Sequence, residues 1–400
     1  MMRQLILLFC LAGCLFSCRK DDELVMPTVN HVQSGGEVTA DTVKTDSTIT
    51  ITEYHGLYVL CEGNMGSNKA TLDYLNLQTG QYHQNIFPSR NPNQVKELGD
   101  VGNDCKIYGS RLWLVINCSN KVEVCTADSA FSLGHVDIPN CRYLAFHEGY
   151  AYVSSYVGPV GGSSVQGSVY KVDTLSLKVV GQVSVGYQPE EMAVADGKLY
   201  VANSGGYNVL EGKGYDRRIS VIDLKSFTVE REIEVAPNLW RLRADQYGQL
   251  WVTSRGNYGT QPGQLFLLTP NSESGQMEIS KRFDLPVTDI AFRGDSLCYI
   301  GVDDTHEEAD YYCSGVINLR TLEVVSNELV KGLDQLETPY GLMVHPLTGD
   351  IYVMDATNYV SNGLLICYDV TGQQEKWRTF TGDIPGHGCW NINIKTSIII

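Results

Sequence analysis

The sequence predicts an all-β fold, a seven-bladed β-propeller with four antiparallel strands in each blade. The first observation behind this prediction is a short apolar motif with a central Tyr, Trp or Cys that recurs at a spacing of about 49 residues, a period typical of solenoids, arrays and propellers. The seven copies are Leu57–Val59, Leu112–Leu114, Ala151–Val153, Leu199–Val201, Leu250–Val252, Leu297–Tyr299 and Ile351–Val353.

The second observation is that each repeat divides into four short strands joined by turns. In the fourth repeat we expect strands at Glu191–Ala195, Leu199–Ala202, Arg218–Leu224 and Thr228–Val235. Tight turns separate them, as at Asp196-Gly197, because Asp and Gly accept the backbone angles of a hairpin. A β-helix or a sandwich explains the period less well than a closed ring.

The third observation concerns the two ends of the repeat region. The first repeat has only a weak pattern for its first strand, whereas a segment that begins at Pro385 follows the last repeat. This segment resembles those that begin at Pro189 and Pro339, where a first strand starts. We therefore expect the C-terminal segment to supply the innermost strand of the first blade and so to close the ring, which leaves no permanent open edge.

Composition excludes some classes of partner. The 400 residues carry a net charge of −16 and no long run of Lys or Arg, so electrostatic attraction to nucleic acid or anionic lipid is not expected.

The N-terminus predicts a membrane anchor formed by lipid. Residues 1–17 read as a bacterial lipoprotein signal peptide, with an apolar run too short to span a membrane. We expect lipidation at Cys18, with Cys14 as the alternative, then a flexible tether over residues 18–47 and the propeller over residues 48–400. This arrangement predicts a cell-surface lipoprotein of an outer membrane, attached through its lipid only.

Nine of the twelve cysteines lie beyond Cys18. Most of them fall within strand patterns, where a free cysteine behaves as a small buried apolar residue. Cys118 and Cys141 lie in loops of adjacent repeats, and a disulfide between them remains open.

Several phrases resemble a known family. Tyr187–Met192, Lys198–Tyr207 and Ser220–Leu224 are similar to YncE-like seven-bladed propellers, over about residues 55–387. Four other segments resemble the surface-lipoprotein branch that includes the cobalamin-binding BtuG proteins, which cap an outer-membrane cobalamin transporter. These are Leu57–Asn68, Glu97–Asp104, Val115–Val124 and Thr381–Pro385.

The resemblance implies a ligand and a partner: cobalamin or a related corrinoid, and an outer-membrane TonB-dependent transporter. One segment departs from the family, whose members continue with a Phe-rich strand where this chain reads Gly388–Lys395. Trp390, Ile392 and Ile394 still alternate there, so that a closing strand remains compatible with the sequence.

Candidate ligand-binding residues lie where propeller loops converge, before the innermost strands and after the second strands. They combine aromatic rings, which can cover apolar faces of a large ligand, with amides and charged groups that can bond its polar edges. The candidates are Asn103, Asp104, Asn120, Arg142, Tyr143, Tyr156, Glu190, Asn203, Tyr207, Trp240, Arg241, Arg255, Tyr258, Tyr340 and Tyr359. The alternative is that these side chains only cap strands and fill the channel.

Catalysis has little support in the sequence, and we expect no enzyme, metal or resident cofactor. An acid pair could be formed by Asp100 with Asp104 or by Glu190 with Glu191, but carboxylates that are solvated or that cap loops explain these residues as well. The acidic run 303–310 is typical of a solvated loop. The leading function is capture of a corrinoid and its transfer to a transporter. The alternatives are an adhesive module that binds glycan or protein and a propeller hydrolase or lactonase.

Overall fold

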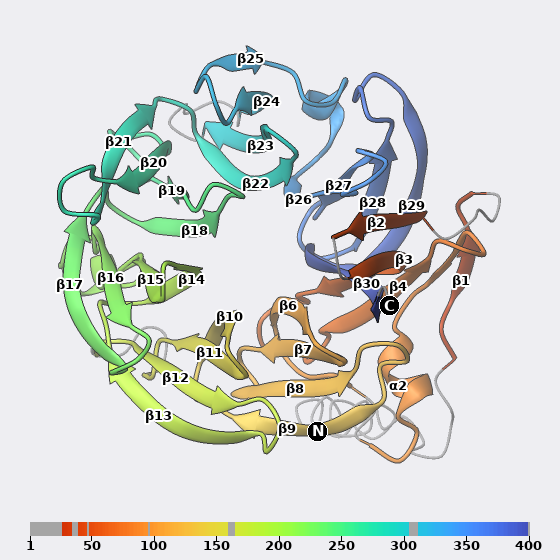
Figure 1. Ribbon diagram of the computed structural model, residues 1–400. Coiled ribbons are helices and arrows are strands. Elements are labelled where there is room, and N and C mark those ends of the chain that lie inside the picture. The colour runs from red at the N-terminus through yellow and green to blue at the C-terminus, as the bar shows by residue number, and fades with distance from the viewer. Residues whose placement is uncertain are drawn as a thin grey trace, which may run out of the picture.

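The computed structural model describes residues 26–33, 39–45, 48–94, 97–158, 165–303 and 311–398. Their strands form seven antiparallel sheets around a central axis, so the predicted seven-bladed propeller is confirmed (Figure 1). The predicted signal peptide, Cys14, Cys18 and the acidic run beyond Asp303 lie outside the described residues. In the part of the chain that is described, no helix is long and apolar enough to cross a membrane.

Six blades have the same four-stranded order, in which each strand pairs with the next one along the chain. Blades two to four contain β6 (Gly102–Tyr108), β7 (Arg111–Ile116), β8 (Lys121–Thr126), β9 (Ser132–Asp137), β10 (Cys141–His147), β11 (Tyr150–Ser155), β12 (Ser168–Asp173), β13 (Lys178–Ser184), β14 (Pro189–Ala195), β15 (Lys198–Asn203), β16 (Arg218–Asp223) and β17 (Thr228–Glu234). Blades five to seven contain β18 (Leu239–Ala244), β19 (Leu250–Ser254), β20 (Gln264–Pro270), β21 (Met277–Phe283), β22 (Val287–Arg293), β23 (Ser296–Asp303), β24 (Tyr311–Asn318), β25 (Val324–Ser326), β26 (Pro339–Val344), β27 (Ile351–Asp355), β28 (Asn362–Tyr368) and β29 (Glu375–Asp383).

The first blade joins the two ends of the chain. Its innermost strand is β30 (Pro385–Ile398), which pairs antiparallel with β3 (Thr48–Cys61), and β4 (Thr71–Asn76), β5 (Gln81–His83) and β1 (Val29–His31) follow outward. The expected closure by the C-terminal strand is therefore confirmed, and the divergent segment after Gly388 continues the strand. A short helix α2 (Ile86–Arg90) and the 3-10 turns η1 (Asn208–Glu211) and η2 (Leu333–Gln335) lie in connections.

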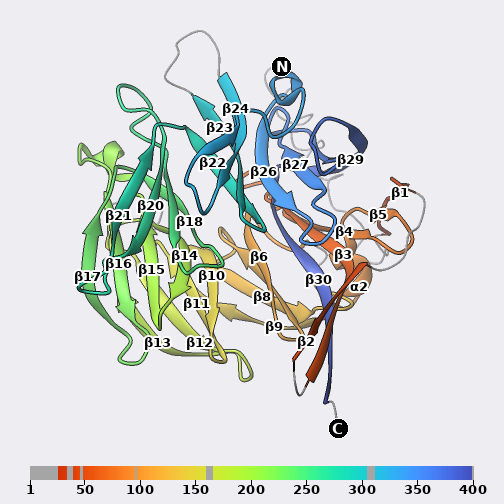
Figure 2. The same cartoon turned by 45° about the horizontal axis from the view of Figure 1, so that its top comes forward.

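The sheet of the first blade begins earlier than the expected boundary at Thr48. Within residues 18–47, which we expected to be a flexible tether, β1 pairs with β5, and β2 (Thr39–Lys44) pairs with the first half of β3. The polar composition of residues 39–44 favoured a tether, but backbone hydrogen bonds to β3 hold this segment as a strand. Its polar side chains can stay exposed because an antiparallel strand may face water. Figure 2 shows β2 and the C-terminal end of β30 extending away from the ring.

The recurring apolar motif occupies the second strand of every blade. Its central side chains are buried, and Trp113 and Trp251 are fully enclosed. The apolar clusters pair neighbouring blades; one of them joins Val201 and Leu199 of blade four to Tyr152 of blade three. Burying each such side chain stabilises the fold by about 1.5–3 kcal/mol. The apolar surface against which it packs belongs to a neighbouring blade.

All nine cysteines that the structure describes are free. The Cys141 thiol donates to the carbonyl oxygen of Lys121 at 3.3 Å, and the Cys118 thiol donates to Asn117 Oδ1 at 3.4 Å. The structure therefore contains no disulfide between these two described cysteines.

Candidate functional site

A cavity of about 590 Å³ lies at one mouth of the central channel. Two kinds of segment provide most of its lining: the beginnings of innermost strands and the loops that leave second strands. The first kind contributes Asn103, Arg142, Tyr143, Trp240, Thr288 and Tyr340, and the second contributes Glu62, Asn64, Met65, Asn117, Tyr156, Tyr207, Arg255, Tyr258 and Tyr359.

A β-bulge explains how the innermost strands present these side chains. The register of β10 shifts between Cys141 and Leu144, and that of β18 shifts between Leu239 and Leu242. A bulge leaves residues outside the ladder and turns their side chains away from the regular alternation. Consecutive residues such as Trp240 and Arg241 can then reach different parts of the channel.

Tyrosines form much of the cavity wall. Tyr156 and Tyr207 meet edge to face at a centroid distance of 6.1 Å, and Tyr340 and Tyr359 do so at 6.0 Å. Tyr258 stands at the rim with 53% of its surface exposed. The loops after the second strands of blades three, four, five and seven thus bring aromatic side chains to one mouth.

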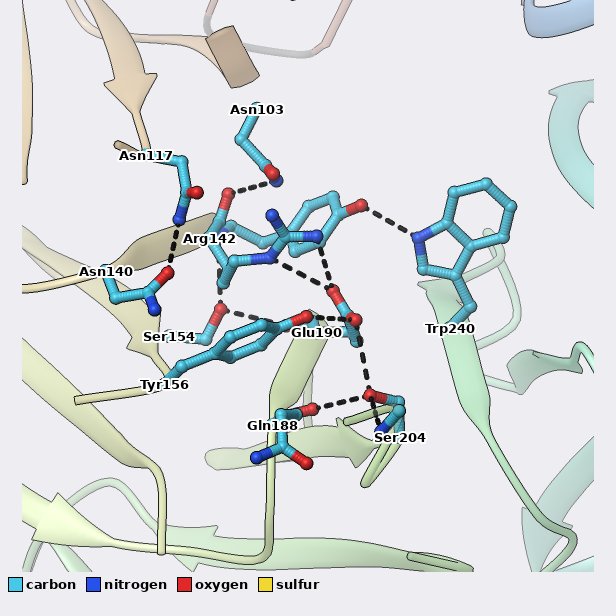
Figure 3. A network of polar contacts seen from close by, with 12 residues as sticks. Asn103, Asn117, Asn140, Arg142, Ser154, Tyr156, Gln188, Glu190, Ser204 and Trp240 are labelled. Atoms are coloured by element: carbon cyan, nitrogen blue, oxygen red, sulfur yellow. Dashed lines mark hydrogen bonds and ion pairs between the residues drawn. The ribbon is translucent and has the colours of Figure 1, made fainter. Parts of the chain in front are cut away.

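A buried ion pair connects blade three to blade four beside this wall (Figure 3). The Arg142 Nη2 atom lies 3.2 Å from Glu190 Oε2, and the hydroxyl of Tyr156 donates to Glu190 Oε1. Only 2% of the Glu190 side chain is exposed. Burial raises the pKa of Glu190, but the guanidinium groups of Arg142 and Arg255 outweigh it and hold the pKa below its ordinary value.

Blade five adds a second arginine and an indole to the same wall. The guanidinium of Arg255 lies over the Trp240 ring at 3.9 Å from its centroid, and that of Arg142 lies over the Tyr156 ring at 4.8 Å. The indole Nε1 of Trp240 donates to the hydroxyl of Tyr143 at 2.9 Å. These stacked contacts hold both guanidinium groups in place.

Glu62 and His387 lie on the side formed by blades one and seven. Glu62 Oε1 accepts a hydrogen bond from the hydroxyl of Tyr340 at 3.0 Å and lies 3.2 Å from His387 Nε2. His387 belongs to the closing strand β30, so ring closure brings its imidazole against Glu62.

Ten of the fifteen predicted residues line this cavity, and the other five lie elsewhere. Glu190 lies behind the wall. Asp104 and Arg241 line a second cavity of about 450 Å³ on the inner strands. Asn203 is fully buried and donates to the carbonyl oxygen of Arg218 at 2.8 Å, and Asn120 accepts a bond from the backbone N–H of Asn140 through Oδ1 at 2.7 Å.

Carboxylates in the second cavity connect neighbouring blades. Asp104 accepts a hydrogen bond from the backbone N–H of Leu144 in the next blade at 2.9 Å. Glu191 in blade four accepts a hydrogen bond from the backbone N–H of Leu242 in blade five at 3.2 Å. Asp104 and Glu191, considered above as members of acid pairs, are therefore engaged in backbone contacts between blades.

The prediction missed several cavity residues, including Glu62, Met65 and Thr288. The rule that selected the others could have found them. Glu62 and Met65 follow the second strand of blade one, and Thr288 lies within the β22 bulge. Among the described residues, no group of three or more His, Cys, Asp or Glu side chains is arranged to hold a metal ion.

Comparison with known proteins shows the fold. No protein-family model and no curated protein matches the chain. A putative 6-phosphogluconolactonase from Bacteroides fragilis has a TM-score of 0.58 and 12% identity, covering 88% of this chain and 99% of its own. For hydrazine synthase from Kuenenia stuttgartiensis the TM-score is 0.57 at 14% identity, covering 74% of this chain and 95% of its own. A quinonprotein alcohol dehydrogenase-like protein from Bacteroides thetaiotaomicron has a TM-score of 0.55 at 11% identity, covering 86% of this chain and 84% of its own. These similarities establish a β-propeller fold and identify no specific family or ligand.

Proposed function

We propose that this protein is a cell-surface lipoprotein whose propeller captures cobalamin or a related corrinoid and passes it, unchanged, to an outer-membrane TonB-dependent transporter. The observation that carries the proposal is the tyrosine-lined cavity at one mouth of the ring. The sequence resemblance described above supports the choice of ligand, partner and location. The lipid anchor would hold the propeller at the membrane surface where such a transporter opens.

The size and lining of the cavity support a corrinoid as the ligand. Its volume of about 590 Å³ falls within the usual range for small-molecule sites, and aromatic faces can cover the apolar surfaces of a macrocycle. Arg142 and Asn103 offer polar groups for peripheral amides. A ligand larger than the cavity would also rest on the exposed rings of Tyr258 and Tyr359 at the rim.

Calorimetric titration of the purified protein with cyanocobalamin and cobinamide tests the proposal. We expect both corrinoids to bind, because the macrocycle that they share would supply the stacking surface. Absence of heat with both, in a folded and monodisperse sample, would overturn corrinoid capture and favour the adhesive alternative. Co-purification of a β-barrel transporter with the affinity-tagged lipoprotein from solubilised membranes tests the partner separately.

A further inference from the structure

The charges around Glu190 do not balance. Two guanidinium groups, those of Arg142 and Arg255, face its single carboxylate, at 3.2 Å from Oε2 and 3.7 Å from Oε1. Arginine keeps its charge in proteins, and the pKa of Glu190 is held below its ordinary value, so all three groups are ionised at neutral pH. One positive charge therefore remains on the wall formed by blades three to five.

Glu190 has little capacity left to bond Arg255. Its Oε2 atom accepts from Nε and Nη2 of Arg142, at 3.4 and 3.2 Å, and its Oε1 atom accepts from Tyr156 and lies 3.3 Å from the hydroxyl of Ser204. The 3.7 Å separation from Arg255 exceeds hydrogen-bond distance. The guanidinium of Arg255 bonds the side chain of Tyr258, whereas its buried Nε has no hydrogen-bond partner among the described residues.

Two other charged groups of the channel, Glu62 and Arg241, have polar partners of their own. Glu62, on the side of blades one and seven, is bonded by Tyr340 and lies beside His387. Arg241 lies 3.3 Å from Asp289 and lines the second cavity. These pairs leave Arg142 and Arg255 as the two cations of the first cavity wall, among the residues that the structure describes as lining it.

We infer that Arg142 and Arg255 form a subsite for one anionic group of the ligand, a phosphate or a carboxylate, beside the tyrosine wall. An anion there would neutralise the surplus charge and use guanidinium donors that Glu190 leaves free. Stacking on Tyr156 and Trp240 fixes both guanidinium planes in advance, which lowers the ordering cost of binding. The subsite rests on the proposed function for its corrinoid ligand, whose anionic group would be the phosphate next to the macrocycle.

Cobinamide and cobinamide phosphate test the subsite, because they differ only by the phosphate group. We expect the phosphate form to bind at least about tenfold more tightly, as for a charge-assisted hydrogen bond, and the preference to weaken in high salt. Arg255→Gln should bring the ratio of the two affinities close to one, whatever its effect on the affinity for cobinamide itself, because the ratio isolates the phosphate group. Equal affinities of the two ligands for the unmodified protein would overturn the subsite.

Two further variants guard against misfolding. Arg255→Lys keeps the charge, so we expect it to retain part of the preference for phosphate. This variant tests the subsite if Arg255→Gln does not fold. Arg217→Gln is the matched control, because Arg217 is exposed and its ion pair with Glu234, at 3.3 Å, lies outside the cavity. An equal loss of preference in Arg217→Gln would also overturn the subsite.

A simpler probe separates this inference from corrinoid capture. Phenyl phosphate and benzyl alcohol share an aromatic ring, but only the first carries an anion. If neither corrinoid binds while phenyl phosphate binds more tightly than benzyl alcohol, and Arg255→Gln removes this difference, the subsite stands and the proposed ligand is wrong. If cobinamide and cobinamide phosphate bind equally well, and phenyl phosphate binds no more tightly than benzyl alcohol, corrinoid capture stands and the subsite is wrong. If no probe binds, both are overturned.

Discussion

Asp73 on β4 accepts a hydrogen bond from the backbone N–H of Gly382, near the end of β29, at 3.0 Å from Oδ2. This contact joins the first blade to the seventh. The same fully buried carboxylate accepts bonds from the backbone N–H of Asn85 at 2.8 Å and the hydroxyl of Tyr82 at 3.0 Å. Burial raises the pKa of Asp73 to about 6 although these hydrogen bonds lower it, so the group is mostly ionised at pH 7 and can accept from all its donors.

Replacing Asp73 by Asn should weaken the seam of the ring. An amide has only one acceptor oxygen, so its NH₂ group would face a buried donor, and we expect the free energy of unfolding at pH 7 to fall by about 1–3 kcal/mol. Urea unfolding measures this change. Asp196→Asn is the control, because Asp196 is exposed at φ 47°, where Asn is tolerated. Equal stability of both variants would show that the Asp73 carboxylate contributes nothing to closure.

Gly388 tests the fit of the closing strand. A Cβ at this position would meet Met343 Sδ and lie 3.0 Å from the carbonyl oxygen of Tyr58 and 3.1 Å from Met354 Cε. Overpacking of this kind typically costs about 1–3 kcal/mol, so Gly388→Ala should lower the melting temperature. Gly214→Ala serves as control because no atom lies within 4 Å of its Cβ position. An unchanged melting temperature for Gly388→Ala would argue against the observed packing of β30.

Glu190→Gln should reveal the buried ion pair through its pH dependence. The pKa of Glu190 is depressed in the folded state, so the ionised carboxylate stabilises the fold above the unfolded-state pKa of about 4.3, and this contribution is lost as pH falls through the lower folded-state pKa. Removing one partner of a buried pair costs about 3–5 kcal/mol. We expect that difference in unfolding free energy at pH 7 and a smaller one at pH 3.5.

The exposed pair of Glu234 and Arg217 provides the comparison for this experiment. Glu234→Gln should change stability by less than about 0.5 kcal/mol at either pH, because surface pairs are screened by water and salt. A difference between wild type and Glu190→Gln that stays constant from pH 7 to pH 3.5 would contradict an ionised Glu190.

Tyr258→Ala should weaken ligand binding without unfolding the protein. The ring is exposed at the rim and contacts Tyr215 edge to face at 6.4 Å. Loss of one aromatic contact of about 0.5–1.5 kcal/mol corresponds to about a 2- to 12-fold weaker affinity for cyanocobalamin. Calorimetry measures it, with Tyr247→Ala as the control, since Tyr247 is exposed in the turn between β18 and β19. Equal affinity of Tyr258→Ala and wild type would place the ligand elsewhere.

The sequence alone was sufficient for the blade plan and for much of the cavity. Local patterns carry that information: the buried second strands repeat at one period, and Tyr156, Tyr207, Tyr258 and Tyr359 follow them at similar positions. A strand that repeats in sequence also repeats in place around a ring, so residues at equivalent positions reach the same mouth. The expected position of the C-terminal strand followed from the same reasoning.

Only the tertiary structure decided how neighbouring side chains are shared between the two cavities. Trp240 and Arg241 are adjacent in sequence, yet they line different cavities, because a bulge interrupts the alternation of β18. The ion pair of Arg142 with Glu190 and the pairing of β2 with β3 likewise join segments from different blades or from outside the repeats. Repeat period and local propensity fix which strands form, whereas these contacts depend on blade geometry and on burial of charge, which exist only once the ring has closed.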